Sequence, residues 1–367
     1  TCLVRASDDE TARRRLDAVF DVGDGPLRAD YLRLAPDHLT VLAGDKDSPN
    51  LGLDDQVWNR LAADVDLIVD PAALVNHLLS YRELFGPNVS GTAELIRLAL
   101  TTTRKPYVYI STVGVADQVG SAELLEDTDI RELSATRVVH DGYANGYGNS
   151  KWAGEVLLAD AHDRFGLPVS VFRCDMIVAD DSDLGQLNLP DMFTRLLMSV
   201  LATGLAPQSF YRLDADGGRA RAHYDALPVD FLAAAISALA VGDGHVTYNA
   251  VNPHSDGIDL DTFVGWLTES GEEIALVDDY DHWYRLFSDA LADLPEKQRR
   301  HSLIPLLHNY TRPIEPVDAG VVNAPLFAAA VRSGQVTTAT AEYADIPHIT
   351  SQVVANYARG LRTLGVI

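Results

Sequence analysis

The sequence has 367 residues, 47% of them hydrophobic, and a formal net charge of −24 at pH 7. Nucleic acids and anionic membranes bind basic surfaces, so this charge argues against both as partners. No apolar run approaches the roughly 18 residues of a membrane span. Residues 1–15 lack the apolar core of a signal peptide, and two cysteines are too few for a disulfide framework. We therefore expect a cytoplasmic protein, and we predict no metal site.

Short apolar segments alternate with helical segments through much of the chain. The spacing predicts strands at 1–5, 39–45, 65–70, 106–116, 168–180 and 245–251, and helices at 8–20, 51–65, 88–103 and 147–166. This alternation is typical of βαβ units that form a parallel sheet covered on both faces. We predict a doubly wound, Rossmann-type α/β domain over residues 1–180, to which the strand at 245–251 returns.

The pattern changes near residue 253. Helical stretches and prolines dominate from there, without a convincing series of strands. We assign 181–224 and 253–367 to a smaller, mainly helical substrate domain. Ligands of doubly wound sheets bind at the carboxyl ends of the strands, so we look for the site at those ends.

One predicted helix carries a tyrosine and a lysine on the same face. Only four lysines occur among the 29 basic residues, and Lys151 follows Tyr147 by four positions. An ammonium group beside a phenol favours the phenolate, so we expect Lys151 to lower the pKa of Tyr147 and make it a usable acid near neutral pH.

The strand at 106–116 contains two hydroxyl residues that point to the same site. Ser111 and Thr112 follow the apolar stretch "YVYI". In a doubly wound sheet this strand end faces the start of the next helix, so Thr112 is positioned to hydrogen-bond the substrate oxygen that Tyr147 protonates. The alternative is that the two hydroxyls only terminate the strand.

These residues and the segments around them resemble a known family. "CLVRA", "GDKDSPNLGL", "YISTVGVADQ", "YANGYGNSKWAGE", "VFRCDMIVAD" and the closing "YARGLRTLGVI" are similar to the terminal reductase domain of carboxylic acid reductases. That domain is an extended short-chain dehydrogenase/reductase, and the resemblance runs from the first residue to the last. Thioester reductase domains of nonribosomal peptide synthetases resemble the first half more loosely.

The resemblance implies an NADPH-dependent reductase that converts an acyl thioester, held on the phosphopantetheine arm of a carrier domain, into an aldehyde. It makes Thr112 and Tyr147 hydrogen-bond donors to the thioester oxygen, and Tyr147 the proton donor. Lys151 is expected to hold the nicotinamide ribose. Ser111, Cys174 and Asp175 are predicted as further cofactor contacts; the alternative for Cys174, as for Cys2, is a small buried hydrophobe.

The resemblance also identifies candidate residues for the adenosine end of the cofactor. Arg5 ends the family's second strand, where an arginine accommodates a 2′-phosphate; otherwise it is a surface arginine. Arg15 is a candidate second phosphate contact, with Arg13 and Arg14 as equal rivals. Asp45 and Lys46 fall in the family's "GD" element near the adenine, or in a plain turn.

Three other positions were weighed. Asn88 resembles the helix asparagine that supports the site, or is a helix N-cap. His77 is interpreted as structural. Asp175 ends the fifth strand, where the fold brings the chain beside the nicotinamide. It is either a turn or ion-pair residue or a gate. As a gate, we hypothesise, it makes the productive pose of the nicotinamide costly unless the pantetheine arm is bound, so that reduction stops at the aldehyde.

The sequence departs from the family in one respect. No strand, G-x-x-G-x-x-G loop and helix unit precedes "CLVRA", although pyrophosphate binding depends on that loop. A chain without this loop is expected to bind the cofactor poorly.

Two rival interpretations of the function remain. A sugar-nucleotide epimerase or dehydratase predicts an acidic residue in place of Arg5. A non-catalytic NADP-binding protein is expected to lose Tyr147 or Lys151.

Overall fold

A computed structural model gives the structure of residues 1–21, 25–180, 187–219, 221–240, 242–337 and 342–367. Its main sheet has four parallel strands in the order β3 (Ile68–Asp70), β4 (Tyr107–Thr112), β5 (Val169–Cys174) and β9 (His245–Ala250). Strands β1 (Cys2–Arg5) and β2 (Val41–Gly44) form a separate parallel pair. All six predicted strands therefore exist, and each runs parallel to the strands with which it pairs, but they form two separate sheets.

Alternation along the strands explains why helices cover both faces of the main sheet. Tyr107 and Tyr109 of β4 belong to a core with helices α3 (Asp55–Asp64), α5 (Gly91–Leu100) and α7 (Asn145–Phe165). Val108, between them, belongs to the core on the other face, with α9 (Val229–Leu239) and α13 (Pro325–Ala330). Side chains of a strand point alternately to the two faces, so this is the doubly wound α/β architecture that the sequence predicts.

The two-stranded pair has its own helices. Helices α1 (Asp9–Phe20) and α2 (Pro26–His38) connect β1 to β2. Among the described residues, β1 pairs only with β2, and β3 pairs only with β4. A hollow of about 490 Å³ lies between these edges and is lined by Leu3, Leu42, Ile68 and Val69. No strand, glycine-rich loop and helix unit occurs in the described part of the chain.

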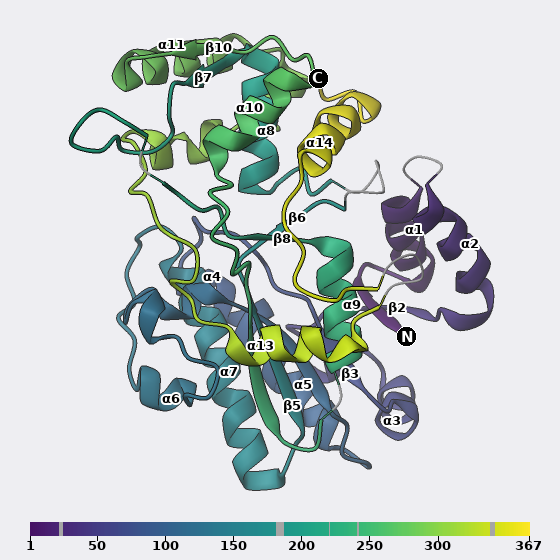
Figure 1. Ribbon diagram of the computed structural model, residues 1–367. Helices are drawn as coiled ribbons and strands as arrows, with labels where there is room; N and C mark the ends of the chain where they lie inside the picture. Colours follow the sequence, from purple (N-terminus) through teal and green to yellow (C-terminus); the bar gives the residue numbers. More distant parts are fainter. Residues whose placement is uncertain (22–24, 181–186, 220, 241, 338–341) are drawn as a thin grey trace.

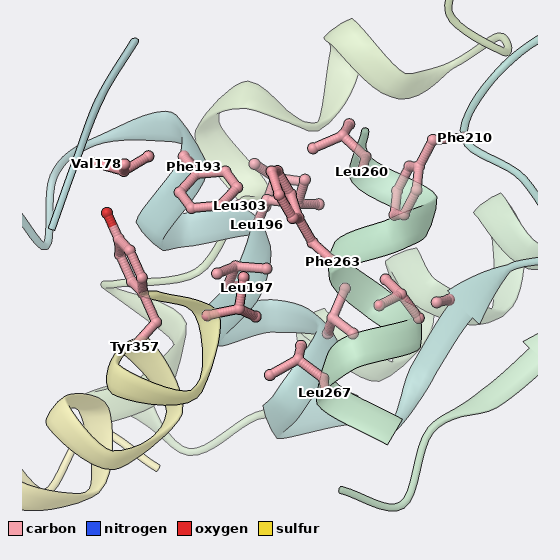
Figure 2. Packing of buried hydrophobic residues seen from close by; sticks show 14 of the residues in the cluster. Val178, Phe193, Leu196, Leu197, Phe210, Leu260, Phe263, Leu267, Leu303 and Tyr357 are labelled. Atoms are coloured by element: carbon pink, nitrogen blue, oxygen red, sulfur yellow. The ribbon is translucent and has the colours of Figure 1, made fainter. Parts of the chain in front are cut away.

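The second lobe is mainly helical and lies above the main sheet in Figure 1. It contains α8 (Met192–Thr203), α10 (Leu260–Glu269), α11 (Tyr280–Asp293), α12 (Glu296–Arg299) and α14 (Ser351–Thr363). Figure 2 shows its core, in which Phe193 meets Phe263 and Tyr357 edge to face at ring-centroid distances of 5.3 and 5.2 Å. Such aromatic pairs contribute roughly 0.5–1.5 kcal/mol beyond their burial.

The remaining elements are short. They are β6 (Met176–Val178), β7 (Leu205–Pro207), β8 (Ala226–Pro228), β10 (Ala275–Val277), α4 (Tyr81–Leu84) and α6 (Ile130–Leu133), with 3₁₀ segments η1 (Pro49–Gly52), η3 (Val113–Ala116), η4 (Ser121–Glu123) and η5 (Ile304–Tyr310), and π-helical segments η2 (Phe85–Ser90) and η6 (Val331–Gln335). Strand β6 pairs with β8, and β7 pairs with β10.

Several predicted boundaries are corrected by these elements. The strand predicted at 106–116 ends at Thr112, because the chain turns into η3. The strand predicted at 168–180 is two strands, since the chain leaves the main sheet after Cys174 and pairs with β8 instead. The sequence analysis also missed α2 and found no strand after residue 253, where β10 lies.

Part of the predicted second domain packs against the main sheet. Residues from Val322 to Ile346 include Phe327 and Val331, which pack in the core on the main sheet with Phe172 and Phe231. Helix α13 contacts β9 directly. The described residues of this segment therefore cover the sheet of the first lobe, although the rest of 253–367 contributes mainly to the second. Residues 181–186 of the predicted excursion lie outside the described residues.

Candidate active site

Helix α7 carries the predicted Tyr147 and Lys151 one turn apart. Two glycines beside Tyr147 allow neighbouring loops to approach the helix. A Cβ atom on Gly146 would collide with the backbone of Leu79 and Tyr81, and one on Gly148 would lie 2.8 Å from the carbonyl oxygen of Gly114. The start of α7 is therefore held between the loops that follow β3 and β4, which places Tyr147 at the carboxyl end of the sheet.

Lys151 is buried beneath α7, and its ammonium group lies 3.8 Å from the centroid of the Tyr109 ring. Burial lowers the pKa of Lys151 to about 8. Burial also raises the pKa of Tyr147 to about 12, with Cys174 as a second, smaller cause. The expected lowering of the Tyr147 pKa by Lys151 is therefore wrong for this structure, because desolvation dominates. A phenol with this pKa stays protonated at neutral pH and can donate a proton.

The two hydroxyl residues of β4 have different surroundings. Thr112 caps η3, its Oγ1 accepting a hydrogen bond of 3.1 Å from the amide of Gly114. Because Gly114 packs against Gly148 of α7, the turn after Thr112 meets the start of the helix that carries Tyr147. Ser111 is buried and donates to Glu155 instead. The structure thus gives Ser111 a contact within the protein, while its role toward a cofactor stays a prediction.

Glu155 belongs to a buried polar network that sequence reasoning missed. It forms an ion pair of 2.8 Å with Arg173, and both side chains are at most 3% exposed. The guanidinium group of Arg173 also donates to the carbonyl of Leu125. Glu155 follows Lys151 by one turn and Arg173 stands alone in an apolar strand; these two signals were available in the sequence. The network fixes α7 against β4 and β5.

Cys174 and Asp175 lie where β5 ends. Cys174 is buried, and desolvation raises its pKa to about 12. Asp175 reaches solvent, yet enough protein surrounds its carboxyl group that desolvation raises its pKa to about 6. Asp225 stands opposite, because Met176 pairs with Ala226 in the β6–β8 ladder. Desolvation and the charge of Asp175 raise the pKa of Asp225, whose carboxylate accepts from the amide of Asn252 at 2.8 Å.

Three of the predicted adenosine-end residues line one hollow of about 480 Å³: Arg5, Arg15 and Asp45. The side chain of Arg5 is 77% exposed and forms an ion pair of 3.4 Å with Asp45, and Arg15 donates to the Arg5 carbonyl.

The neighbouring arginines are engaged elsewhere. Arg13 pairs with Asp17, and Arg14 pairs with Glu10. Of the three, Arg15 alone lines the hollow, which favours it over its two rivals, and its contact with a phosphate stays a prediction. Two guanidinium groups in one open hollow suit a phosphate, which is the group expected there.

Lys46 points away from that hollow. Its ammonium group lies 2.6 Å from the Asp70 carboxylate, which also accepts from the Tyr107 hydroxyl at 2.7 Å. The nearly buried pair ties the "GD" turn to the end of β3. Lys46 therefore has a structural partner here, and a contact with adenine stays a prediction.

Asn88 lies inside the π-helical segment η2 and is not an N-cap. Its side chain accepts from the amide of Leu74 at 2.8 Å and donates to the Ser150 hydroxyl at 2.9 Å. Asn88 thus connects the loop after β3 to α7 next to Lys151, in agreement with a supporting role.

His77, interpreted from the sequence as structural, lies beside Tyr147. Its ring centroid is 5.2 Å from that of Tyr147, and its Nδ1 is 2.9 Å from the Tyr143 hydroxyl. Burial lowers the pKa of His77. No sequence pattern signalled the contact with Tyr147, because it joins the loop after β3 to helix α7, about 70 positions along the chain.

The described residues show neither a metal cluster nor a membrane-spanning helix. Within the described ranges, no three His, Cys, Asp or Glu side chains gather closely enough to hold a metal ion. No described helix combines the length and apolar character needed to cross a membrane.

The sequence and the structure were compared with known proteins. Residues 1–236 match the NAD-binding family described as male sterility protein. The whole chain is 58% identical to a carboxylic acid reductase of Mycobacterium marinum and 55% identical to one of Mycobacterium tuberculosis. It spans 31% and 32% of the length of these two relatives.

A solved structure is also similar over the whole chain. It is the reductase (R) domain of a nonribosomal peptide synthetase from Mycobacterium tuberculosis, with a TM-score of 0.91 and 48% identity, and the chain covers 85% of it. The terminal R domain of the myxalamid pathway, at 24% identity and a TM-score of 0.74, shares the fold. The chain belongs to the male sterility protein family of NAD-binding domains and is a terminal reductase domain of the extended short-chain dehydrogenase/reductase type.

Proposed function

We propose that the chain reduces an acyl thioester to an aldehyde with NADPH, as the reductase domain of a carboxylic acid reductase. The observation that carries this proposal is the convergence of Tyr147, Lys151 and the turn after Thr112 at the carboxyl end of the main sheet. The names of the two mycobacterial relatives support it, because they match the whole chain.

Hydride from the bound nicotinamide supplies the reducing equivalent, and this chain's side chains control the oxygen. Tyr147 keeps its proton at neutral pH, since burial raises its pKa to about 12. As charge develops on the thioester oxygen, hydrogen bonds from Tyr147 and Thr112 stabilise it, and Tyr147 transfers its proton. Collapse of the resulting hemithioacetal releases the thiol and the aldehyde. Lys151 is proposed to hold the nicotinamide ribose from below.

The proposal of NADPH over NADH rests on Arg5 and Arg15. Both line the hollow beside Asp45, and two cations there favour a ribose that carries a 2′-phosphate. An NAD-specific epimerase or dehydratase uses an acidic residue at the strand end where Arg5 stands. The retained Tyr147 and Lys151 favour an enzyme over a non-catalytic NADP-binding protein.

We further propose a phosphopantetheine carrier domain as the partner. Support comes from the length of the relatives, of which this chain matches about a third. A solved thiolation-reductase di-domain shares the fold at 19% identity and a TM-score of 0.67. Asp175 is proposed as the gate that restricts reduction to substrates bearing the arm.

The direct experiment mixes the full-length protein with NADPH and an acyl pantetheine thioester and measures aldehyde. Aldehyde formation supports the proposal. Absence of aldehyde, with NADPH binding confirmed separately, counts against it.

A further inference from the structure

The loop between β3 and α4 contacts the start of α7 through both its backbone and its side chains. The carbonyl oxygen of His77 accepts a hydrogen bond of 2.9 Å from the amide of Ala144. Ala144 precedes α7 and has a φ of 60°, a left-handed conformation that is uncommon for a residue with a Cβ. Such conformations persist where the surroundings hold them, so the residue before the helix is kept in place by His77.

The His77 side chain continues the same contact toward Tyr147. The two ring centroids lie 5.2 Å apart, with the ring planes tilted by 54°. The His77 ring also meets the Tyr143 ring edge-on at 5.3 Å, and its Nδ1 is hydrogen-bonded to the Tyr143 hydroxyl at 2.9 Å. His77 therefore lies between the proposed proton donor and a second tyrosine.

Tyr143 in turn reaches the other lobe. Its hydroxyl lies 3.8 Å from the sulfur of Met192 at the start of α8, and its ring meets that of His308 in η5 at 5.7 Å. The contacts thus run from Met192 and His308 of the second lobe, through Tyr143 and His77, to Tyr147. Tyr143 and His308 are both exposed, so this chain of rings lies at the rim between the lobes.

We infer that His77 is a positioning residue, which holds the Tyr147 ring in its reactive orientation and links that orientation to the second lobe through the hydrogen bond to Tyr143. This inference rests on the proposed thioester reduction. A phenol that is held in place acts on the developing charge without first reorganising. The contact pattern assigns the positioning to the His77 side chain as it is held by its hydrogen bond to Tyr143, and the coupling to the same hydrogen bond.

Kinetics of single and double variants test the inference in the full-length protein. His77→Phe keeps a ring but removes the hydrogen bond, and Tyr143→Phe removes only the hydroxyl. Each is expected to lower kcat for a pantetheine thioester about 3- to 10-fold, the range that follows from loss of one hydrogen bond, with the Kd of NADPH unchanged. His77→Gln keeps a hydrogen-bonding group and should recover part of the loss. His282→Phe, in an exposed histidine of α11, is the matched control.

The Tyr147→Phe background distinguishes positioning from independent catalysis. If His77 acts through Tyr147, adding His77→Phe to Tyr147→Phe leaves the residual rate unchanged. If the double variant is slower than Tyr147→Phe by the same factor that His77→Phe costs alone, the inference is overturned. It is also overturned if the His77→Phe protein folds and has the parental kcat. If His77→Phe does not fold, the milder Tyr143→Phe decides by the same criteria.

A second readout does not depend on activity. In protein labelled with ¹³C-tyrosine, with the Tyr147 signal assigned from Tyr147→Phe, the Tyr143→Phe variant should shift the Tyr147 ring signal, and His282→Phe should not. If Tyr143→Phe no longer shifts the Tyr147 signal in a His77→Gln background, the effect is transmitted through the His77 ring. If Tyr143→Phe leaves the Tyr147 signal unmoved in the parent background, the inference is overturned. An inactive parent contradicts the proposed function, and the spectra still decide the inference.

Discussion

The ammonium group of Lys151 lies 3.8 Å from the centroid of the Tyr109 ring, so the lysine that the sequence pairs with Tyr147 is also held against the sheet. Cation–π contacts of this kind stabilise a desolvated cation. Burial nevertheless lowers the pKa of Lys151 to about 8, because the charged form loses its water.

This pKa predicts a pH dependence. Lys151 carries its charge below pH 8 and loses it as pH rises through that value. If the charged form supports turnover, kcat for the thioester falls between about pH 7 and 9, after correction for thioester hydrolysis. Lys151→Arg stays charged and should show no fall in this window, although its larger group will reduce the absolute rate. A flat parental profile from pH 6.5 to 9.5 would contradict this role of the charge.

Cofactor preference tests the hollow beside Asp45. Loss of a charge-assisted contact to a 2′-phosphate costs about 1.5–3 kcal/mol, and the high exposure of Arg5 favours the lower end. Arg5→Ala and Arg15→Ala should each raise the Kd of NADPH roughly tenfold and leave that of NADH nearly unchanged. Arg13→Ala is the control, since Arg13 pairs with Asp17. Equal losses of affinity for NADPH and NADH would contradict the assignment of Arg5 and Arg15 to the 2′-phosphate.

The gate predicts a change in substrate range. Asp175→Gly should increase NADPH-dependent reduction of free benzaldehyde by about tenfold, equivalent to relief of roughly 1.4 kcal/mol, and affect thioester reduction less. Asp243→Gly, in an exposed loop residue, is the control. Asp175 is not the gate if the variant reduces benzaldehyde no faster than the parent.

The same gate has a pH signature. Because the pKa of Asp175 is raised to about 6, its carboxylate is present above pH 6 and is neutralised below it. The parental ratio of benzaldehyde to thioester reduction should therefore rise between pH 7.5 and 5.5. Asp175→Gly should show a flat ratio; a parallel rise in that variant assigns the effect to another group. Asp225 stands opposite and shares the titration, so Asp225→Asn should alter the profile.

Stability tests the buried network under α7. Glu155→Leu leaves the Arg173 cation buried without its partner, which costs about 3–5 kcal/mol. Asp160→Leu breaks two partly exposed ion pairs of the same helix, with Arg164 and Arg131, and such pairs contribute about 0–1 kcal/mol each. The free energies of unfolding from urea titrations compare the two variants. Similar losses for both would show that the Glu155–Arg173 pair is not the anchor of α7.

The sequence predicted the parts of the fold that depend on local periodicity. Apolar runs identified the strands that became β3, β4, β5 and β9, and Gly166 ends α7 in a left-handed conformation as its position indicated. Strands β6, β7, β8 and β10 have three residues each and pair with distant partners, so their sequences carry no period. The covering of the main sheet by Phe327 is equally a long-range contact.

For the candidate site, too, local spacing was predictable from the sequence and long-range contacts were not. Tyr147 and Lys151 were recognisable because helical spacing places them on one face, while the direction of Lys151 depends on Tyr109 in another element. Arg15, Arg13 and Arg14 are equal candidates by sequence, because the ion pairs that engage Arg13 and Arg14 are visible only in the folded structure. The contact of His77 with Tyr147 was not predicted, because it depends on how the loop after β3 meets helix α7.

The most direct test of the account measures aldehyde from an acyl pantetheine thioester, in parallel for the full-length parent and its Tyr147→Phe variant, after NADPH binding has been measured for both. The account predicts one aldehyde per NADPH consumed by the parent. It also predicts a loss of roughly 100-fold or more in kcat for Tyr147→Phe, with NADPH binding largely retained. Near-parental turnover by Tyr147→Phe, or NADPH-bound parent that forms no aldehyde, would contradict it.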